Sequence, residues 1–327
     1  MATNQTVCRL LVGNELRRVR EATGRKQEEA AEHIGTTVAK ISRLELGQTR
    51  ITLGDVKMLL EFYGDDPQHI EGMLSLARNA NQRGRWDGDR SVFPEWFRMY
   101  VDLEAGAQDI RQVQAEIVPG LLQVEPYIRA IHSQGPRSLP ETSVDASVKA
   151  RRRRQEIFTK DDPPTVSFVL SESCLHRQVG GPEVMRTPLD YLIEIAQLPT
   201  VQLQVLPFET KTYPGAASMS FALLTIGAPG IASPLDFVYL ESFDDARYLD
   251  DKEAVRAYVG LWSRLSATAL GPEESIDLIR NVARQHQQHN RKGRTPCPPL
   301  TSPMLGGSRA AAANKAATVS NSPPSTT

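Results

Sequence analysis

The stretch Glu28–Gly47, EEAAEHIGTTVAKISRLELG, decides the fold of the N-terminal region. Its first half predicts a short helix, Gln27–Ile34, because the apolar residues Ala30, Ala31 and Ile34 fall on one side of it. Gly35 is expected to end this helix with a positive φ, which glycine adopts without steric cost. The small side chain of Ala31 leaves room for a second helix to cross closely.

The second half of the stretch predicts that crossing helix, Val38–Leu46. Thr37 is a natural N-cap for it, and Gly47 ends it. Ile41 and Leu44, three residues apart, are expected to face inward. Two short helices joined by a tight glycine-containing turn are typical of the helix-turn-helix motif, whose second helix enters the major groove of DNA.

Amphipathic helices are also predicted on both sides of this motif. The segment LLVGNELRRVREATG places Leu11, Leu16 and Val19 on one face. The segment TLGDVKMLLEFYG offers Thr52 as N-cap and Gly64 after its end. Its apolar residues are expected to close the core of an all-α head: Leu53, Val56, Leu59, Leu60 and Tyr63.

Pattern and charge divide the chain of 327 residues into a helix-turn-helix domain (10–77), a polar linker (78–91), a mixed α/β domain (92–285) and a disordered tail (286–327). Residues 9–64 carry ten Lys/Arg against eight Asp/Glu, residues 91–285 carry nineteen against twenty-six, and residues 286–327 carry five against none. A polyanion is therefore expected to meet the ends of the chain and not its acidic middle.

The α/β domain is predicted from short runs rich in Val, Phe, Tyr and Leu, separated by helical segments. The expected strands are 165–170, 201–207, 219–226 and 236–242. The expected helices are 108–117, 141–159, 183–196, 252–269 and 272–284. The order of the strands does not follow from the sequence.

The composition also indicates a compartment. No run approaches the roughly 18 consecutive apolar residues of a membrane span, and the first residues lack the pattern of a secretory signal. Cys8, Cys174 and Cys297 are too scattered for a zinc site or a disulfide framework. We therefore expect a cytoplasmic, nucleoid-associated protein with no membrane partner.

The head resembles a known family. GRKQEEAAEHIG, KISRLELG and LGQTRITLGDVKMLLEFYG are similar to the Xre-type (Cro/CI-like) helix-turn-helix domain of transcriptional regulators, a lambda-repressor-like fold, over Leu10 to about Gly64. Lys26 stands where that family often has a Thr or Ser N-cap, so we expect the first motif helix to be less well capped. The resemblance implies a double-stranded DNA operator as partner.

The resemblance extends beyond the head. FPEWFRMYVDLEAGA, AEIVPGLLQVEPYIRAI and VGGPEVMRTPLDYLIEIAQLPTVQLQVLPF are similar to the C-terminal domain of actinobacterial Xre-type regulators that are described as antitoxin-like. Such regulators are frequently encoded beside a small partner protein, so the resemblance implies that kind of partner here.

The motif positions predict how individual residues meet DNA. Gln27, first in its helix, is expected to bond a phosphate, although a solvated side chain is the alternative. Val38 and Ala39 are apolar and can contact thymine methyl groups, or pack in the interface without reading bases. Arg43 can reach a guanine or a phosphate, with a salt bridge to a neighbouring carboxylate as the alternative.

The remaining members of the predicted DNA-binding set contribute affinity or lie on the same surface. Lys40, Gln48 and Arg50 are expected to contact phosphates. Ser42 lies on the outer side of the second motif helix, and Thr37 precedes its first turn.

Other charged or polar groups give no comparable signal. The run KARRRR (149–154) lies within a helical segment, where a solvated helix with some ion pairs is favoured over a nucleic-acid patch. His69, His132 and His176 have no ligand-spaced partners, and no catalytic constellation is recognisable. We therefore expect no enzyme activity, no cofactor and no metal.

The sequence thus predicts a DNA-binding transcriptional regulator whose helix 38–46 enters the major groove. A homodimer is expected, because one recognition helix contacts too few bases. The α/β domain would bind an effector or a partner, or dimerise. The alternative is an antitoxin-like interaction protein that holds a small partner protein and regulates its own operon.

Overall fold

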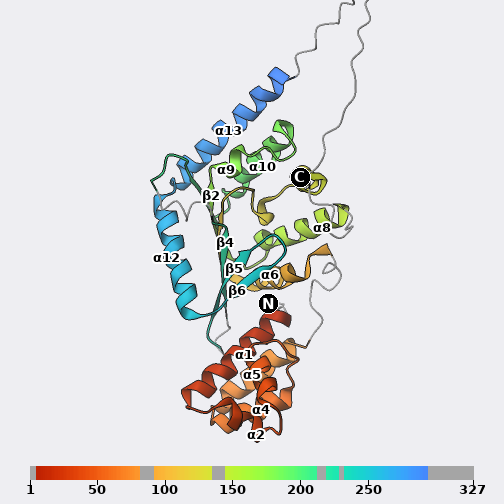
Figure 1. Cartoon of the computed structure of the whole chain (residues 1–327), viewed down its shortest axis with the longest axis vertical. Helices are drawn as coiled ribbons and strands as arrows, with labels where there is room; N and C mark the ends of the chain where they lie inside the picture. Colours follow the sequence, from red (N-terminus) through yellow and green to blue (C-terminus); the bar gives the residue numbers. More distant parts are fainter. Residues whose placement is uncertain (1–4, 82–91, 135–143, 212–218, 228–231, 294–327) are drawn as a thin grey trace, which may run out of the picture.

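A computed structural model describes residues 5–81, 92–134, 144–211, 219–227 and 232–293 of the chain. Figure 1 shows a helical head at one end and an α/β body at the other. Residues 82–91 of the predicted linker and 294–327 of the predicted tail lie outside the described residues. Among the described residues, no helix has both the length and the apolar character that a membrane crossing requires.

The head consists of five helices, the four that the sequence predicts and a fifth, α5, that follows them. They are α1 (Gln5–Ala22), α2 (Gln27–His33), α3 (Val38–Glu45), α4 (Leu53–Tyr63) and α5 (Pro67–Asn79). The Thr52 hydroxyl caps α4 by accepting the Asp55 N–H, and Gly64 ends α4 at φ 74°. Asp66 caps α5 in the same way through the N–H groups of Gln68 and His69. Local signals therefore set these boundaries.

The core of the head differs from the prediction at one residue. Leu11, Leu16, Val56, Leu59, Leu60 and Tyr63 are all buried, as expected. Leu53 is instead 38% exposed. Leu53 lies one turn before Val56 and on the same face of α4, as helical periodicity predicts. It is the first residue of the helix, however, and no other element of the described chain covers that end.

The body contains a six-stranded sheet with helices on both faces. Its strands are β1 (Ala107–Gln114), β2 (Thr165–Ser171), β3 (Val201–Leu206), β4 (Phe221–Ile226), β5 (Leu235–Glu241) and β6 (Ala246–Leu249). Its helices are α6 (Glu95–Gly106), η2 (Gly120–Leu122), α7 (Glu125–Gln134), α8 (Val144–Gln155), η3 (Glu156–Thr159), α9 (Ser173–His176), α10 (Pro182–Ile195), α12 (Lys252–Thr268) and α13 (Pro272–Gly293).

The strand order is β3-β2-β1-β4-β5-β6. β1 pairs in parallel with β2, and β2 with β3. β4, β5 and β6 add antiparallel pairs at the other side of β1. The crossover helices α7, α8 and α10 connect the parallel strands, as parallel pairing requires. The mixed α/β class predicted from the sequence is confirmed.

The predicted helix 108–117 is wrong, because this segment forms β1, a central strand of the sheet. Ile110 and Val113 are spaced three apart, which imitates one face of a helix. In the strand they belong to opposite hydrophobic clusters, one on each side of the sheet. A central strand buried on both faces carries no clean alternation, so its period misled the prediction.

Each face of the sheet has its own helical cover. Trp262 and Leu265 of α12 pack with Val113, Val169 and Val238 on one face. On the other face, residues of α6, α10 and α13 join the larger cluster. Figure 1 shows α12 along one side of the sheet, and α13 extending beyond the end of the sheet.

The body also extends farther toward the C-terminus than the sequence indicates. The last helix was expected to end near 284 and the tail to begin at 286, whereas α13 runs to Gly293. His286 is 5% exposed, and its Nε2 lies 2.9 Å from the Leu175 carbonyl oxygen. The prediction failed here because a polar, glutamine-rich segment is held by a tertiary contact.

Three further elements of the body, namely α6, α7 and β6, were missed by the sequence analysis.

The head and the body touch through α1. The Thr6 hydroxyl donates to the Asp102 carboxylate of α6 at 2.6 Å. Gly106, at the end of α6, lies so near Val7 that a Cβ there would stand 2.7 Å from a Val7 methyl carbon. The Ser233 N–H donates to Glu15 at 3.2 Å. α1 is therefore shared between the two parts.

A buried ion pair joins α6 to α8 inside the body. The Arg154 guanidinium donates to both oxygens of the Glu104 carboxylate, at 2.7 and 2.8 Å. Both residues are at most 5% exposed. The run 149–154 was expected to be a solvated helix, and Arg154 departs from that because its turn of α8 faces the core.

Substituting Arg154 tests this pair. We expect Arg154→Met to lower the free energy of unfolding by about 3–5 kcal/mol, because Glu104 is then left charged and buried without a partner. The double variant Arg154→Met/Glu104→Leu should recover much of that loss. Arg152→Met, on the same helix but 67% exposed, should change stability by no more than about 0.5 kcal/mol. Denaturant unfolding of the four proteins measures this, and equal losses in the single and double variants would contradict it.

Candidate nucleic-acid interface

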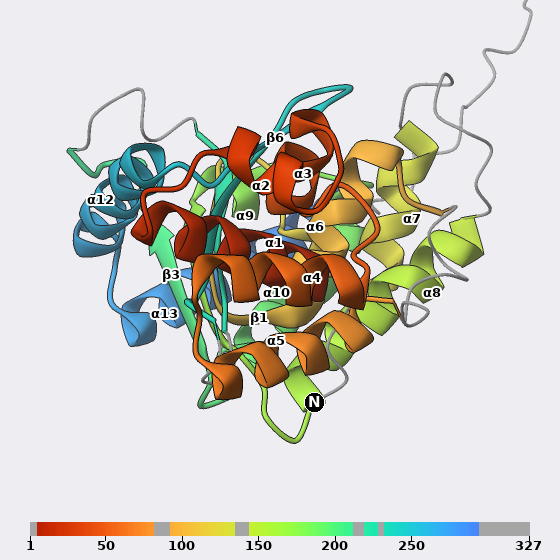
Figure 2. The same ribbon diagram turned by 90° about the horizontal axis from the view of Figure 1, so that it is seen from below.

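The motif predicted from the opening stretch is formed by α2, a tight turn and α3. Gly35 adopts φ 66° after α2. The Thr37 hydroxyl accepts the Lys40 N–H at 3.2 Å and so caps α3. Gly47, also at φ 66°, follows the end of α3. Figure 2 shows α2 and α3 side by side on the head.

The start of α2 is better capped than the sequence indicates. The Lys26 side chain cannot serve as an acceptor, as expected. The Glu29 carboxylate instead accepts the Lys26 backbone N–H at 2.7 Å. This is one half of a capping box, supplied from inside the helix.

α3 rests on α1 at very short range. Ile41 and Leu44 are fully buried, and Ala31 is 3% exposed, as the crossing predicts. A Cβ at Gly13 of α1 would stand 2.5 Å from the Leu44 carbonyl oxygen and 2.7 Å from that of Glu45. α1 and the end of α3 therefore meet backbone to backbone, which glycine permits.

A buried ion pair fixes the end of α3. Arg20 of α1 donates to the two Glu45 oxygens at 2.6 and 3.0 Å. Its remaining nitrogen donates to the Arg25 carbonyl oxygen at 2.9 Å, which ties in the start of α2. Burial, and then the Glu45 charge, raises the pKa of the neighbouring Tyr63 to about 12. No local sequence pattern indicated Arg20 as the partner of Glu45, because the two residues lie 25 positions apart.

Gln27 belongs to the same network. Its side-chain amide donates to Glu45 at 2.7 Å. One of its two amide hydrogens is therefore engaged within the protein, and the other stays available for a phosphate. The phosphate contact itself stays a prediction, and the simple solvated alternative does not describe this half-buried side chain.

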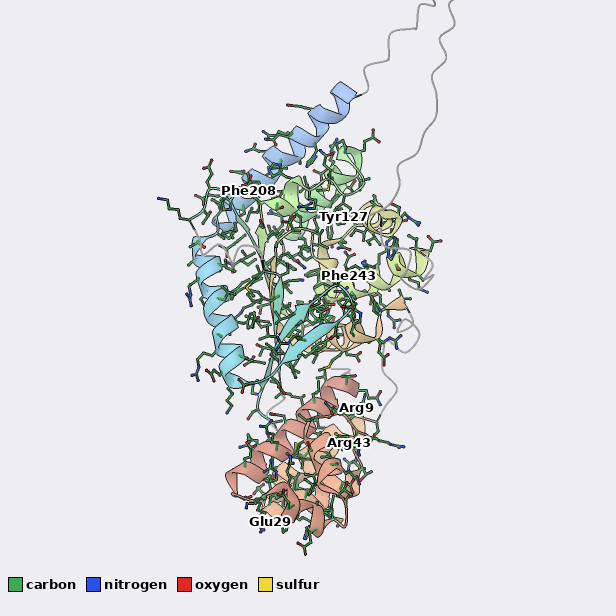
Figure 3. All side chains as sticks on the ribbon, in the orientation of Figure 1. Arg9, Glu29, Arg43, Tyr127, Phe208 and Phe243 are labelled. Carbon is green, nitrogen blue, oxygen red and sulfur yellow. The ribbon has the colours of Figure 1, made fainter. Side chains whose placement is uncertain are left out.

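The outer face of α3 carries the residues that were expected to read bases. Val38 is 38% exposed, and Ala39 and Arg43 are exposed as well. The Arg43 guanidinium folds back to the Ala39 carbonyl oxygen at 3.3 Å. No carboxylate among the described residues pairs with Arg43, so the salt-bridge alternative is not observed. Figure 3 shows Arg43 on the outside of the head.

The surrounding polar residues divide into free and paired groups. Gln48 and Arg50 are exposed, and Ser42 is half-buried. Lys40 is paired, with its ammonium 3.0 Å from the Asp55 carboxylate of α4. No local pattern indicated this pair, because Lys40 and Asp55 belong to different helices.

The rest of the described chain shows no competing chemical centre. No group of His, Cys, Asp and Glu among the described residues is arranged to hold a metal ion. Burial raises the pKa of Cys8 to about 11 and that of Cys174 to about 12, so neither thiol is a ready nucleophile at neutral pH. An open hollow of about 580 Å³ between α7 and α8 is lined largely by ion-paired side chains such as Arg129 and Glu125.

The close approach at Gly13 can be tested against a matched glycine. Gly13→Ala should cost about 1–3 kcal/mol of head stability, because its methyl group would overlap two carbonyl oxygens and push α1 from α3. Gly54→Ala, in α4 with open space around it, should be neutral or stabilise by up to about 1 kcal/mol through helix propensity. Thermal or urea unfolding measures both, and stabilisation by Gly13→Ala would refute the packing described.

Comparison with known protein families finds two matches, one in the head and one in the body. Residues 11–71 match a helix-turn-helix domain, which supports DNA binding by the head. Residues 97–281 match a domain of unknown function (DUF5753) that spans most of the body. No curated protein and no solved structure matches the chain. Since this second match covers more than half of the residues, the chain belongs to the DUF5753 family, with a helix-turn-helix domain at its N-terminal end.

Proposed function

We propose that this protein is a sequence-specific transcriptional regulator of the Xre (Cro/CI-like) type, in which α3 enters the major groove of an operator. The observation that carries the proposal is the outer face of α3. It exposes Val38, Ala39 and Arg43, while the one acidic residue of the helix, Glu45, is buried and paired with Arg20. A helix with this face can approach the polyanionic groove without repulsion.

The side chains on this surface differ in the role that we assign to them. Arg43 is the long polar donor among the base-facing residues, and an arginine fork matches the O6 and N7 acceptors of guanine. Val38 and Ala39 offer methyl groups to thymine. Gln27, Gln48 and Arg50 lie at positions suited to phosphates, as do the N-terminal amides of α2.

Lys40 is assigned a phosphate contact that competes with its ion pair. Its ion pair with Asp55 is partly exposed, with the Lys40 side chain 36% and the Asp55 side chain 18% accessible. Ion pairs with an exposed partner contribute about 0–1 kcal/mol. A DNA phosphate, which is also an anion, can replace Asp55 as the partner. In the free protein, the ion pair with Asp55 keeps the Lys40 side chain near the position from which it would contact the phosphate.

The remaining parts of the proposal concern assembly and the body. Two copies of the head are needed to read two half-sites, about 34 Å apart, so a homodimer on the operator is proposed. The body is assigned to effector or partner binding, without enzymatic activity, in a cytoplasmic, nucleoid-associated protein. The antitoxin-like alternative assigns the body to a small partner protein, and recovery of a stoichiometric small protein with the tagged full chain would favour it.

Two substitutions separate base reading from phosphate binding. Arg43→Ala should weaken binding to the cognate operator by about 1–3 kcal/mol and relax the preference at one base pair per half-site. Lys40→Ala should weaken binding to cognate and random DNA alike, and reduce the salt slope by about one unit. Competition titrations against scrambled DNA at two salt concentrations measure both effects. If Arg43→Ala lowered the affinity equally for every DNA sequence, Arg43 would be a phosphate contact and not a base contact.

The assembly on DNA is a separate prediction. At saturation, the complex should contain two chains per operator with two half-sites, and one chain on an operator cut to a single half-site, with much weaker binding. Light scattering of the full chain with each DNA measures the stoichiometry. A single chain bound to the intact operator at saturation would show that the dimer proposal is wrong.

A further inference from the structure

Glu15 of α1 is a buried carboxylate at the contact between head and body. Its side chain is 1% exposed. One of its oxygens, Oε2, accepts the backbone N–H of Ser233, in the segment before β5, at 3.2 Å. A buried carboxylate is unfavourable unless cations and hydrogen-bond donors compensate its charge. The groups around Glu15 therefore decide how well this contact with the body is held.

The first cation at Glu15 comes from α1 itself. The Arg18 guanidinium donates from Nε to both Glu15 oxygens, each at 3.0 Å. The Arg18 side chain is 52% exposed, so water screens part of its attraction for the carboxylate. Arg18 is therefore an incomplete partner for a negative charge that is almost wholly buried.

The second partner of Glu15 is His69 of α5. Its Nε2 lies 3.3 Å from Oε1 of Glu15, and its Nδ1 contacts the carboxylate of Asp65, in the turn before α5. Asp65 is held in place because its other oxygen accepts the Asp66 N–H at 3.0 Å. Both ring nitrogens of His69 thus face a carboxylate oxygen.

This placement favours the doubly protonated ring of His69. A neutral imidazole has one N–H, so its other nitrogen would direct a lone pair at a carboxylate oxygen. The imidazolium has two N–H groups, one for each carboxylate. It also balances the charge of the group, in which the carboxylates of Glu15 and Asp65 meet the cations of Arg18 and His69. A neutral His69 would leave one of these negative charges without a counter-charge.

The surroundings also contain effects that disfavour the imidazolium. His69 is the third residue of α5, near the positive end of that helix, and its side chain is only 18% exposed. The Asp66 carboxylate, however, caps this helix end by accepting the His69 N–H at 3.3 Å, which offsets its positive potential. Burial disfavours a cation that stands alone, whereas here a carboxylate lies at ion-pair distance from each ring nitrogen. The two carboxylates therefore outweigh the opposing effects.

We propose that His69 is a pH-sensitive switch in the contact between head and body. Its imidazolium holds the Glu15 carboxylate in the position from which Oε2 accepts the Ser233 N–H. When the proton is lost, a lone pair of His69 faces Oε1, and the Glu15 carboxylate moves away and releases Ser233. Protonation of His69 thus controls how firmly the body holds α1, the helix on which α3 rests.

The direction of the pH dependence follows from the charge of the group. Because the folded protein stabilises the protonated ring, His69 keeps its proton to a higher pH in the folded chain than in the unfolded chain. The contact is complete below about pH 6.5, the ordinary value for histidine, and it is lost as the pH rises through the midpoint of the folded chain. The hydrogen bond to Glu15 raises the pKa of Arg18, so Arg18 stays charged throughout.

The test follows the Ser233 amide of the full chain, labelled with isotopic serine, by NMR between about pH 5.5 and about pH 9. Ser233→Ala, which removes the labelled residue, assigns the signal. We expect the Ser233 signal to shift along one titration curve, with a midpoint at least about one unit above 6.5. The ring protons of His69 should titrate with the same midpoint.

Two substitutions of His69 should fix the two ends of this curve. In His69→Gln, which carries no charge, the Ser233 signal should stay near its high-pH position at every pH. In His69→Lys, which stays charged over this range, it should stay near its low-pH position. The wild-type curve and His69→Lys decide the proposal even where His69→Gln does not fold.

A matched variant excludes a general effect of removing a histidine. His33→Gln changes an exposed histidine of the head, which stacks on Phe62 with the ring centres 4.1 Å apart. It should leave the Ser233 titration unchanged. A Ser233 signal that does not titrate, or that titrates equally in His69→Gln, would overturn the proposal, as would a His69 midpoint at or below about 6.5. Because the readout involves no DNA, its failure is independent of the proposed regulator function.

Discussion

The structure depends on the close packing of α1 against two other helices. Gly13 lets the backbone of α1 approach the carbonyl oxygens at the end of α3, and Gly106 lets α6 approach Val7 at the start of α1. A side chain at either glycine would separate the helices by roughly the width of a methyl group. α1 is therefore the element through which the position of α3 is set relative to the body.

Two buried ion pairs reinforce these contacts in similar ways. Arg20 and Glu45 join α1 to α3, and Arg154 and Glu104 join α8 to α6. Buried pairs of this kind add little net stability, because desolvation of both charges offsets most of their attraction. Their contribution is orientation, since a bidentate pair is satisfied in a single geometry. One pair thus fixes α8 on α6 and the other fixes α3 on α1, and α6 and α1 contact each other directly.

The distribution of polar groups separates the functions of the two parts. In the head, Glu45 of α3 is buried and paired with Arg20, and Asp55 is paired with Lys40, so the outer face of α3 presents apolar and cationic groups. In the body, Arg154 of α8 is drawn into the core, where Glu104 of α6 pairs with it. The first arrangement suits a polyanion in a groove, and the second holds α8 on α6.

The sequence by itself determined the head, because short-range chemistry controls it: Thr37 and Thr52 cap helices, and Gly35 and Gly64 end them. The exposure of Val38, Ala39 and Arg43 also follows from helical periodicity, although their roles on DNA stay predictions. Only the tertiary structure decided that 107–114 is a strand, since pairing with β2 and β4 outweighs a misleading local period. The partners of Gln27, Lys40 and Arg154 were likewise decided there, because each lies 15 or more residues away and no local pattern records such a contact.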